Sequence, residues 1–395
     1  MTAIGTCKSY FHYLRQRECG ITSPKFSTKE TIKNNIAANR FSETFIPIKN
    51  GIDGYAAAGR YFTTASVVST DTSPLTLEIC TIDIFLKKTI WKITQTLSNR
   101  SRINSVCLAH RVIATMDNNQ VSIFQRGYLT NQFSIRGKCD PFLLCDINES
   151  IFIFDRESLL LRYNIKDCSL ETIKTQCSFQ KDYLCSKNEN YFIISRGMFE
   201  EQQPIFQVLS YSVKTSQYHH MTFKGLENPK CKLHENHLFI GYHDKETKEP
   251  KIKIVDLQSG DEEMLPEDAV TCLTQLSALC VDDRHIVYFD YYDDYTSLIS
   301  CFSRKAPYQH LYRMICKHKK AEGLTRDPIL HDEVLCLKLI DEHSPEEIYA
   351  FDVRTGKKLA QINLNASSPS LINSGKFFSI QKNGVCIRDY LTPNS

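Results

Sequence analysis

The chain has 395 residues, of which 42% are hydrophobic and 24% are charged, a composition that allows a sizeable core and is ordinary for a globular protein. Its formal net charge of +3 excludes a global electrostatic attraction to nucleic acid or to an anionic membrane. No uninterrupted apolar run approaches the ~18 residues that a membrane span requires.

Sixteen cysteines are spread along the chain, and no two of them have the C-x-x-C spacing of zinc and thioredoxin motifs. Several lie in apolar runs, where a thiol behaves as a small hydrophobe. A disulfide framework in a secreted protein is the alternative, but the N-terminal MTAIGTCKSYFHYLRQRECG has no apolar signal core. We therefore expect a cytoplasmic or nuclear location, or the host cytosol if the protein is a secreted effector.

Residues 1–42 are predicted to form an N-terminal extension that is partly helical. The segments CKSYFHYLRQREC and KETIKNNIAANRF each favour a helix, the second with Thr28 as its N-cap. The next segment, ETFIPIK at residues 43–49, is a candidate strand. Residues 43–395 are predicted to form the second and larger domain.

A degenerate repeat runs through this domain. Its clearest copies are IKIVDLQSG, starting at Ile252, and IYAFDVRTG, starting at Ile348; both are alternating strands that run into a turn ending in Gly. Weaker copies start at Leu77, Val121, Leu160, Val208, Leu298 and Val385. The seven spacings are 44, 39, 48, 44, 46, 50 and 37 residues, with a mean of 44, which matches the ~40–50 residues of a four-stranded propeller blade.

A second series of apolar runs supports the same period. One run precedes each copy, and the runs start at Arg60, Arg111, Ser150, Asn190, His237, His285, Glu333 and Lys376. Other strands follow most copies or lie between units, such as Ile103–Ala109, Pro141–Asp146 and Val270–Leu276. Each unit therefore contains strands A, B, C and D, and no long helical period interrupts them. The sequence predicts an all-β fold, a single β-propeller with eight four-stranded blades, or seven as the alternative because the first and last units are the weakest.

Ring closure can be predicted from the two ends of the repeat. The last C strand, VCIRDY, ends five residues before the last residue of the sequence, so the last blade lacks an outer strand. The candidate strand at residues 43–49 could supply it. Pairing the first strand with the last would close the ring and cover an exposed sheet edge.

The copies at Ile252 and Ile348 resemble the third strand and following turn of WD-repeat blades, and are similar to units of quinoprotein-like propellers. The Trp-Asp pair of WD repeats is absent, its positions being held by pairs such as Val255-Asp256 and Phe351-Asp352. The extension faintly resembles the linker of F-box-linked propellers, but no F-box is visible. The resemblance implies a β-propeller that binds another protein.

No motif of a catalytic, cofactor-binding or metal-binding site is present, since GxSxG, HExxH, P-loop and GxGxxG patterns are all missing. His219 and His220 are adjacent on a predicted strand, so they point to opposite faces and cannot chelate together. The acidic run from Asp290 to Tyr295 lacks the spacing of a calcium loop. We therefore expect no catalytic residue, cofactor or metal. The alternative is a propeller enzyme, a hydrolase or lyase, with its site in the central channel.

One face of the predicted propeller collects the D–A and B–C connections. Basic residues gather in the first set and acidic residues, such as Glu200 and Glu201, in the second, so signs alternate on this face and nucleic acid is disfavoured. The longest connection, Ile315–Ile329, is the best candidate for recognition. We expect a protein scaffold or substrate receptor, monomeric on its own, that binds another protein and no membrane. The predicted contact residues are Lys317, Lys319, Lys320, Arg326, Tyr291, Tyr292, Arg100 and Arg102.

Overall fold

A computed structural model describes most of the chain from residue 26 to residue 391. The described ranges are 26–48, 52, 54–58, 61–70, 73–83, 86–97, 103–108, 112–117, 120–135, 142–147, 150–155, 159–174, 184–188, 190–265, 276–293, 296–305, 307–317, 323–324, 328–331, 333–340, 346–364, 370–373, 375–381 and 383–391. The predicted helix at CKSYFHYLRQREC lies outside them. No helix among these residues is long and apolar enough to cross a membrane.

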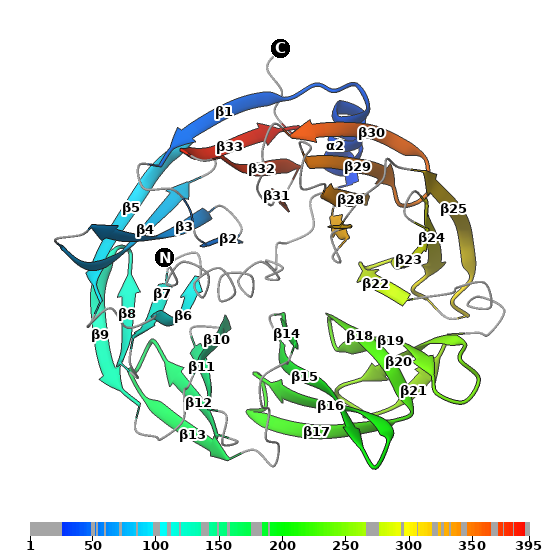
Figure 1. Ribbon diagram of the computed structural model, residues 1–395, viewed down its shortest axis with the longest axis horizontal. Coiled ribbons are helices and arrows are strands. Elements are labelled where there is room, and N and C mark those ends of the chain that lie inside the picture. The colour runs from blue at the N-terminus through cyan, green and yellow to red at the C-terminus, as the bar shows by residue number, and fades with distance from the viewer. Residues whose placement is uncertain are drawn as a thin grey trace.

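The described strands form eight small antiparallel sheets arranged in a ring (Figure 1). In seven of them the strands follow one another in chain order from the centre of the ring outward. The first four of these sheets are β2–β5 (Gly54–Ala58, Tyr61–Thr70, Ser73–Asp83, Lys88–Thr96), β6–β9 (Ile103–Leu108, Val112–Asp117, Gln120–Gln125, Tyr128–Ser134), β10–β13 (Phe142–Ile147, Ser150–Asp155, Leu159–Asn164, Leu170–Lys174) and β14–β17 (Leu184–Lys187, Tyr191–Glu200, Gln203–Ser212, Gln217–Lys224). The others are β18–β21 (Leu226–His234, His237–Asp244, Pro250–Asp256, Glu262–Met264), β22–β25 (Leu276–Val281, His285–Asp293, Thr296–Ser303, His310–Lys317) and β26–β30 (Gly323–Leu324, Ile329–His331, Val334–Ile340, Glu346–Asp352, Lys358–Leu364). The remaining sheet joins β31–β33 (Ser370–Asn373, Lys376–Gln381, Gly384–Asp389) to β1 (Ser42–Pro47).

The fold is the predicted all-β propeller. Every copy of the repeat is the third strand of a sheet, and every member of the second series is the strand before it. The number of blades in the intact ring, eight or seven, stays a prediction because several connections between sheets lie outside the described ranges. The first strand of the β22–β25 sheet is Leu276–Val281, later than the predicted Val270–Leu276, of which residues 270–275 lie outside the described ranges.

The ring is closed as predicted by the strand near the N-terminus. β1 pairs antiparallel with β33 over six residue pairs, from Ser42↔Asp389 to Pro47↔Gly384. Ile46 from β1 packs in one buried cluster with Phe378 from β32 and Phe62 from β3. The pairing therefore joins the first and last parts of the chain and removes a free edge from the last sheet.

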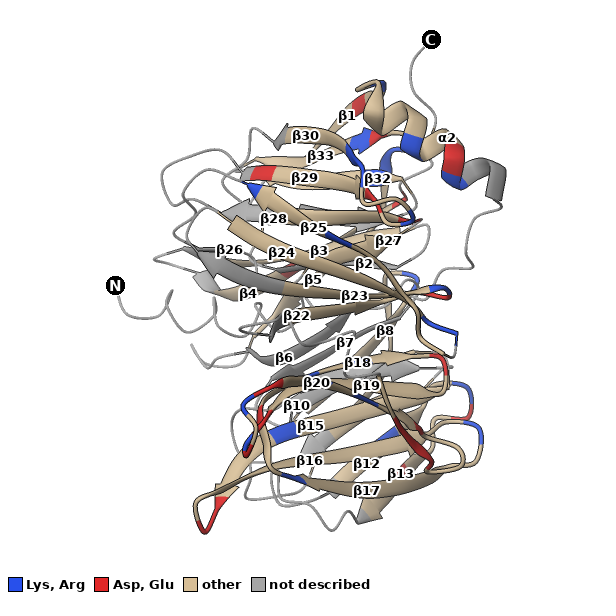
Figure 2. Cartoon of the chain, turned by 90° about the vertical axis from the view of Figure 1, so that its right-hand side faces the viewer, with Lys and Arg blue, Asp and Glu red and all other residues tan. Residues whose placement is uncertain are grey.

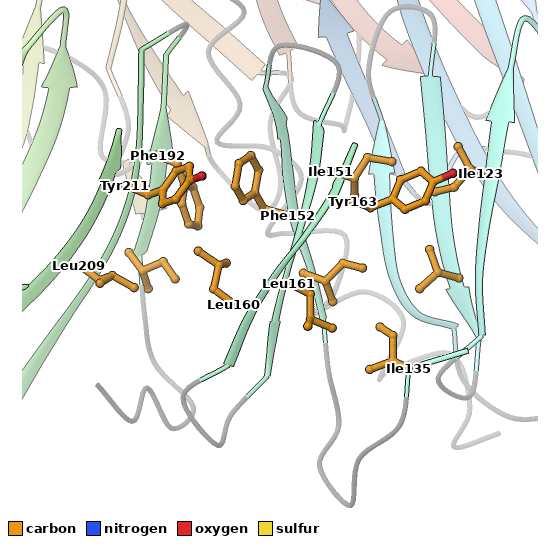
Figure 3. Packing of buried hydrophobic residues seen from close by; sticks show 13 residues of the cluster. Ile123, Ile135, Ile151, Phe152, Leu160, Leu161, Tyr163, Phe192, Leu209 and Tyr211 are labelled. Carbon is orange, nitrogen blue, oxygen red and sulfur yellow. The ribbon is translucent and has the colours of Figure 1, made fainter. Parts of the chain in front are cut away.

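The hydrophobic core lies between neighbouring sheets. Ile151, Phe152 and Ile153 on β11 are all fully buried, although they alternate between the two faces of their sheet. Phe152 stacks on Phe192 of the next sheet, with ring centroids 5.5 Å apart, while Ile151 lies on the other side, towards the preceding sheet (Figure 3). Because neighbouring sheets cover both faces of a second strand such as β11, its sequence is a continuous apolar run. Each buried side chain of such a run stabilises the fold by roughly 1.5–3 kcal/mol.

The turn after the third strand explains why two copies of the repeat are clear. In the copy at Ile252, Asp256 Oδ1 accepts hydrogen bonds from the backbone N–H of Gln258 (2.7 Å) and Ser259 (3.0 Å). Gly260, at a φ of 82°, donates from its N–H to the Asp256 carbonyl. Asp352 and Gly356 repeat this arrangement. The signature is thus a side-chain-capped turn whose last position needs glycine.

The cysteines that the structure describes are free thiols, and five of them are buried: Cys280, Cys301, Cys316, Cys336 and Cys386. Burial raises the pKa of Cys316 to about 11. These thiols act as core hydrophobes, as predicted for cysteines within apolar runs.

Helix α2 (Phe26–Ala37) packs on the ring beside the joined chain ends. It starts before Thr28, so the predicted N-cap is wrong and Thr28 lies in the first turn. Ile32 and Ile36 are buried in a cluster with residues of β28, β29, β32 and β30. Lys33, whose side chain is only 3% exposed, lies 2.9 Å from Glu30, 3.1 Å from Glu333 and 3.7 Å from Asp352.

Replacing Lys33 with alanine is expected to destabilise the protein by about 3 kcal/mol, because it removes a positive charge that lies beside the buried Glu333 carboxylate. Lys29 on the same helix is the control, since it is more exposed and its replacement should have little effect. Thermal melting of both variants measures the difference. Equal melting temperatures for Lys33→Ala and wild type would mean that the ion pairs do not hold α2.

Replacing Gly384 with alanine is expected to loosen β1. A Cβ atom there would collide with the Ile46 carbonyl oxygen on the partner strand, at a cost of roughly 1–3 kcal/mol. Gly197→Ala is the matched control, because nothing lies within 4 Å of the added atom. Hydrogen exchange of amides 42–46 should speed up only in Gly384→Ala; unchanged protection would contradict the role of this pairing.

Candidate partner-binding face

The two faces of the ring differ in what covers them. Helix α2 contacts Glu333, Arg354 and Gly375, which lie in turns between first and second or third and fourth strands. The B–C and D–A connections therefore lie on the opposite face. Figure 2 shows α2 on one side and the acidic tip of the β15–β16 hairpin projecting on the other. The predicted recognition face is thus the one that α2 leaves uncovered.

The most prominent described feature of this face is the β15–β16 hairpin. The two strands pair without interruption from Tyr191↔Ser212 to Glu200↔Gln203. The first half of β15 is buried in the core, and burial along this strand falls towards the tip. Phe199, next to the turn, is 77% exposed. β15 therefore carries an aromatic side chain into solvent at the tip, whereas its partner strand β16 stays buried up to Pro204.

The turn at the tip has an uncommon backbone. Glu201 and Gln202 connect the strands at φ values of 49° and 66°. A two-residue turn with both residues left-handed normally contains Asn and Gly. Holding two residues with side chains in this region costs of order 1 kcal/mol or more each. The turn at the tip is therefore strained.

The neighbouring sheet braces the hairpin. Lys245 Nζ, in the turn between β19 and β20, donates to the Gln202 carbonyl at 3.0 Å. The Lys245 backbone N–H donates to the carbonyl of Gly225, and the Gly225 N–H donates to the carbonyl of Pro204. Three segments from two sheets are thereby tied together near the tip of the hairpin. A tip fixed in this way loses little entropy on binding.

Among the described residues, the charged side chains around Lys245 form ion pairs, whereas the carboxylates at the tip of the hairpin do not. Lys248 lies 2.7 Å from Glu227 and Lys251 lies 3.2 Å from Asp244. The backbone N–H of Thr247 bonded to Asp244 holds the pKa of that carboxyl below its usual range. Within the described residues, Glu200 and Glu201 have no ion-pair partner. The described part of the face therefore presents one apolar ring beside two solvated carboxylates.

Most of the predicted contact residues fall where side chains are not described. Lys319, Lys320, Arg326, Arg100 and Arg102 lie outside the described ranges, and Tyr291 and Tyr292 lie on β23 without described side chains. Lys317 is exposed at the end of β25, two residues after Ile315, which is 63% exposed. Because seven of these eight side chains are not described, the role of the set as one contact surface stays a prediction.

The structure corrects two predictions that the sequence made for this face. The connection Ile315–Ile329 was expected to be a loop, but it contains β26, whose Gly323 and Leu324 pair with Ile340 and Leu339 of β28. The predicted set also missed Phe199, although Glu200 and Glu201 were placed on this face. An apolar residue directly before two charged residues at the end of a predicted strand was the available signal.

The histidines considered for metal binding lie elsewhere. His219 and His220 are exposed on β17, where they pair with Ser210 and Leu209 respectively. Partial burial lowers the pKa of His220. As adjacent strand residues they point to opposite faces, so they do not form a joint site.

Comparisons with known proteins identify the fold. The chain is similar to BamB from Moraxella catarrhalis, with 10% identity and a TM-score of 0.52, over 88% of this chain and 98% of that one. It is also similar to the WD40 domain of SCAP from fission yeast, with 11% identity and a TM-score of 0.52, over 90% and 99%. Sqt1 from Saccharomyces cerevisiae matches with 12% identity and a TM-score of 0.49, over 90% and 98%. No protein-family model and no curated protein matches the chain.

These likenesses agree with the ring of sheets. The chain has a β-propeller fold of the WD-repeat-like or quinoprotein-like kind. At 10–11% identity, they define the fold alone, so the function has to be argued from the residues of this chain.

Relieving the strained turn should stabilise the protein. Replacing Glu201 with asparagine and Gln202 with glycine supplies residues that tolerate left-handed φ values, and we expect a gain of about 1 kcal/mol. Lys214→Gly is the control, because that exposed turn residue does not have a positive φ and glycine there should destabilise slightly. Thermal melting compares the three proteins. No gain in the double variant would show that the tip is unstrained.

Proposed function

We propose that this protein is a non-enzymatic interaction scaffold or substrate receptor that binds another protein on the face formed by its B–C and D–A connections. The observation that carries the proposal is the exposed Phe199 at the tip of a braced hairpin. An aromatic side chain that gains nothing from the core is available to fill a pocket on a partner, and such aromatic anchors dominate the energy of many interfaces.

The surroundings of Phe199 support this proposal. The hydrogen bonds of Lys245 and Gly225 fix the hairpin before any partner arrives, which lowers the entropic cost of binding. The carboxylates of Glu200 and Glu201 add charge that would select a complementary partner and reject others. In this proposal, the predicted basic residues around Lys317, Lys319, Lys320 and Arg326 contribute a second contact on the same face.

Replacing Phe199 with alanine is expected to weaken partner binding by about 30-fold or more, as for an interface hot spot worth roughly 2 kcal/mol. Tyr128→Ala is a matched control: Tyr128 is a 76% exposed aromatic residue, but it starts β9 directly after the turn from β8 and lies at the opposite face. Both variants should melt like the wild type.

The measurement has two stages. Wild type and both variants are used to capture proteins from a lysate, and the partner recovered at equal stoichiometry is then purified and titrated by calorimetry. Loss of binding in Phe199→Ala but not in Tyr128→Ala supports the proposal. Equal affinity for Phe199→Ala and wild type contradicts the role of the hairpin, and reversing the charges of Lys317, Lys319, Lys320 and Arg326 to glutamate then tests the second contact.

A further inference from the structure

On the face that carries α2, a cleft lies between the β18–β21 and β22–β25 sheets. It has a volume of about 300 Å³, and its lining includes Phe239, Ile254, Arg304 and Tyr308. Phe239 and Ile254 are almost fully buried and form an apolar floor. Polar side chains from the turns of both sheets lie at the mouth. The cleft plays no part in the proposed partner-binding face, which lies on the other side of the ring.

Three side chains that could ligate a metal converge at this mouth. His234 is the last residue of β18 and Glu235 follows it in the turn to β19, while Asp283 comes from the turn between β22 and β23. Their donor atoms all lie within 4.8 Å of one another, and His234 Nε2 lies 3.2 Å from Asp283 Oδ1. Two ligands about 2.0–2.2 Å from a tetrahedral zinc ion are roughly 3.3 Å apart. The histidine and the aspartate already have this separation.

One of these donor atoms is poorly satisfied. His234 Nε2 is buried, and in spite of its closeness to Asp283 it makes no hydrogen bond of acceptable geometry. A buried polar nitrogen without a hydrogen bond costs about 1–3 kcal/mol. A metal ion between the imidazole and the carboxylate would satisfy the nitrogen directly. His237, whose Nδ1 is likewise buried without a hydrogen bond, lines the same cleft.

The carboxylate of Glu235 is held in place by Arg304. Arg304 forms an ion pair with Glu235 Oε2 and also donates to the carbonyl of Asp282 at 3.4 Å. The Glu235 side chain is thereby fixed beside the other two candidate ligands. Carboxylates that bind metals are commonly oriented by such hydrogen bonds, and removing these partners weakens metal binding by about 10–100-fold.

We propose that His234 Nε2 and the carboxylates of Glu235 and Asp283 bind a divalent metal ion of the zinc class. Three protein ligands leave a fourth position open, and the exposed fractions of Glu235 and Asp283, 60% and 56%, allow water or another ligand to reach it. Since the ligands come from two sheets, the ion links neighbouring sheets and stabilises their contact. The site lies beyond the sequence expectation of no metal.

The test uses the full-length protein after dialysis against a chelator. Zinc is added by equilibrium dialysis, and bound metal is counted by mass spectrometry in wild type, His234→Ala, Asp283→Asn and His220→Ala. The last variant is the matched control, because His220 is exposed on β17, away from the cleft. Free thiols are zinc ligands in general, so the informative quantity is the difference in bound zinc between variants. The melting temperature of each protein is measured with and without zinc.

We expect wild type and His220→Ala to bind one more zinc ion than His234→Ala or Asp283→Asn, and to gain thermal stability from zinc that the other two do not gain. Arg304→Ala should weaken binding about tenfold or more. Equal zinc binding by wild type and Asp283→Asn, a nearly isosteric change at an exposed position, would overturn the proposal. Tighter binding of magnesium than of zinc would also overturn it, because magnesium prefers oxygen ligands and does not need His234.

Discussion

The pairing of β1 with β33 is the interaction on which the rest of the ring depends. It joins residues 42–47 to residues 384–389, so the contact forms only when nearly the whole chain has been brought into a circle, at a large cost in loop-closure entropy. Without it, β33 would be an open edge of a three-stranded sheet, exposed to pairing with other chains. The cost is offset by what the closure buries. Ile46 enters a core cluster shared by β3, β32 and β33, and α2, immediately before β1, is held against the neighbouring sheet through Lys33. Closure and helix docking therefore support each other.

The period of the fold was predictable because it rests on local chemistry. Asp256 and Gly260, and likewise Asp352 and Gly356, form a capped turn that can be recognised in the sequence without its neighbours. The ring closure was predictable by counting strands. The start of α2 was not, because it depends on packing of Ile32 and Ile36 against β28 and β29 and less on a cap at Thr28. The strand at Gly323–Leu324 was also missed, since two residues that pair only with β28 leave no periodic pattern.

The candidate sites show the same limit. Sequence periodicity could place Glu200 and Glu201 on one face of the ring, because the order of the strands determines on which face each turn lies. It could not show that Phe199 stands clear of the core, since this depends on which side chains near the tip are covered by the neighbouring sheet. The sequence also could not show that His234 and Glu235 lie close to Asp283. These residues are separated by a whole repeat, and only the packing of two adjacent sheets brings their donor atoms within 4.8 Å. Sites made from turns of different sheets are invisible to any motif search along the chain.

The β18–β21 sheet takes part in both sites, at opposite ends of the same strand. β19 starts at His237, beside the metal-ligand turn, and ends at Asp244, where the turn that braces the Phe199 hairpin begins. Eight extended residues span roughly 25 Å, so the two sites cannot touch. Between them, Leu238, Phe239 and Ile240 are buried against sheets on both sides, which leaves the strand no room to slide or change register. A change at one site can reach the other only if the whole sheet tilts between its neighbours. The packing of the ring opposes such a tilt, so the two sites are expected to act independently.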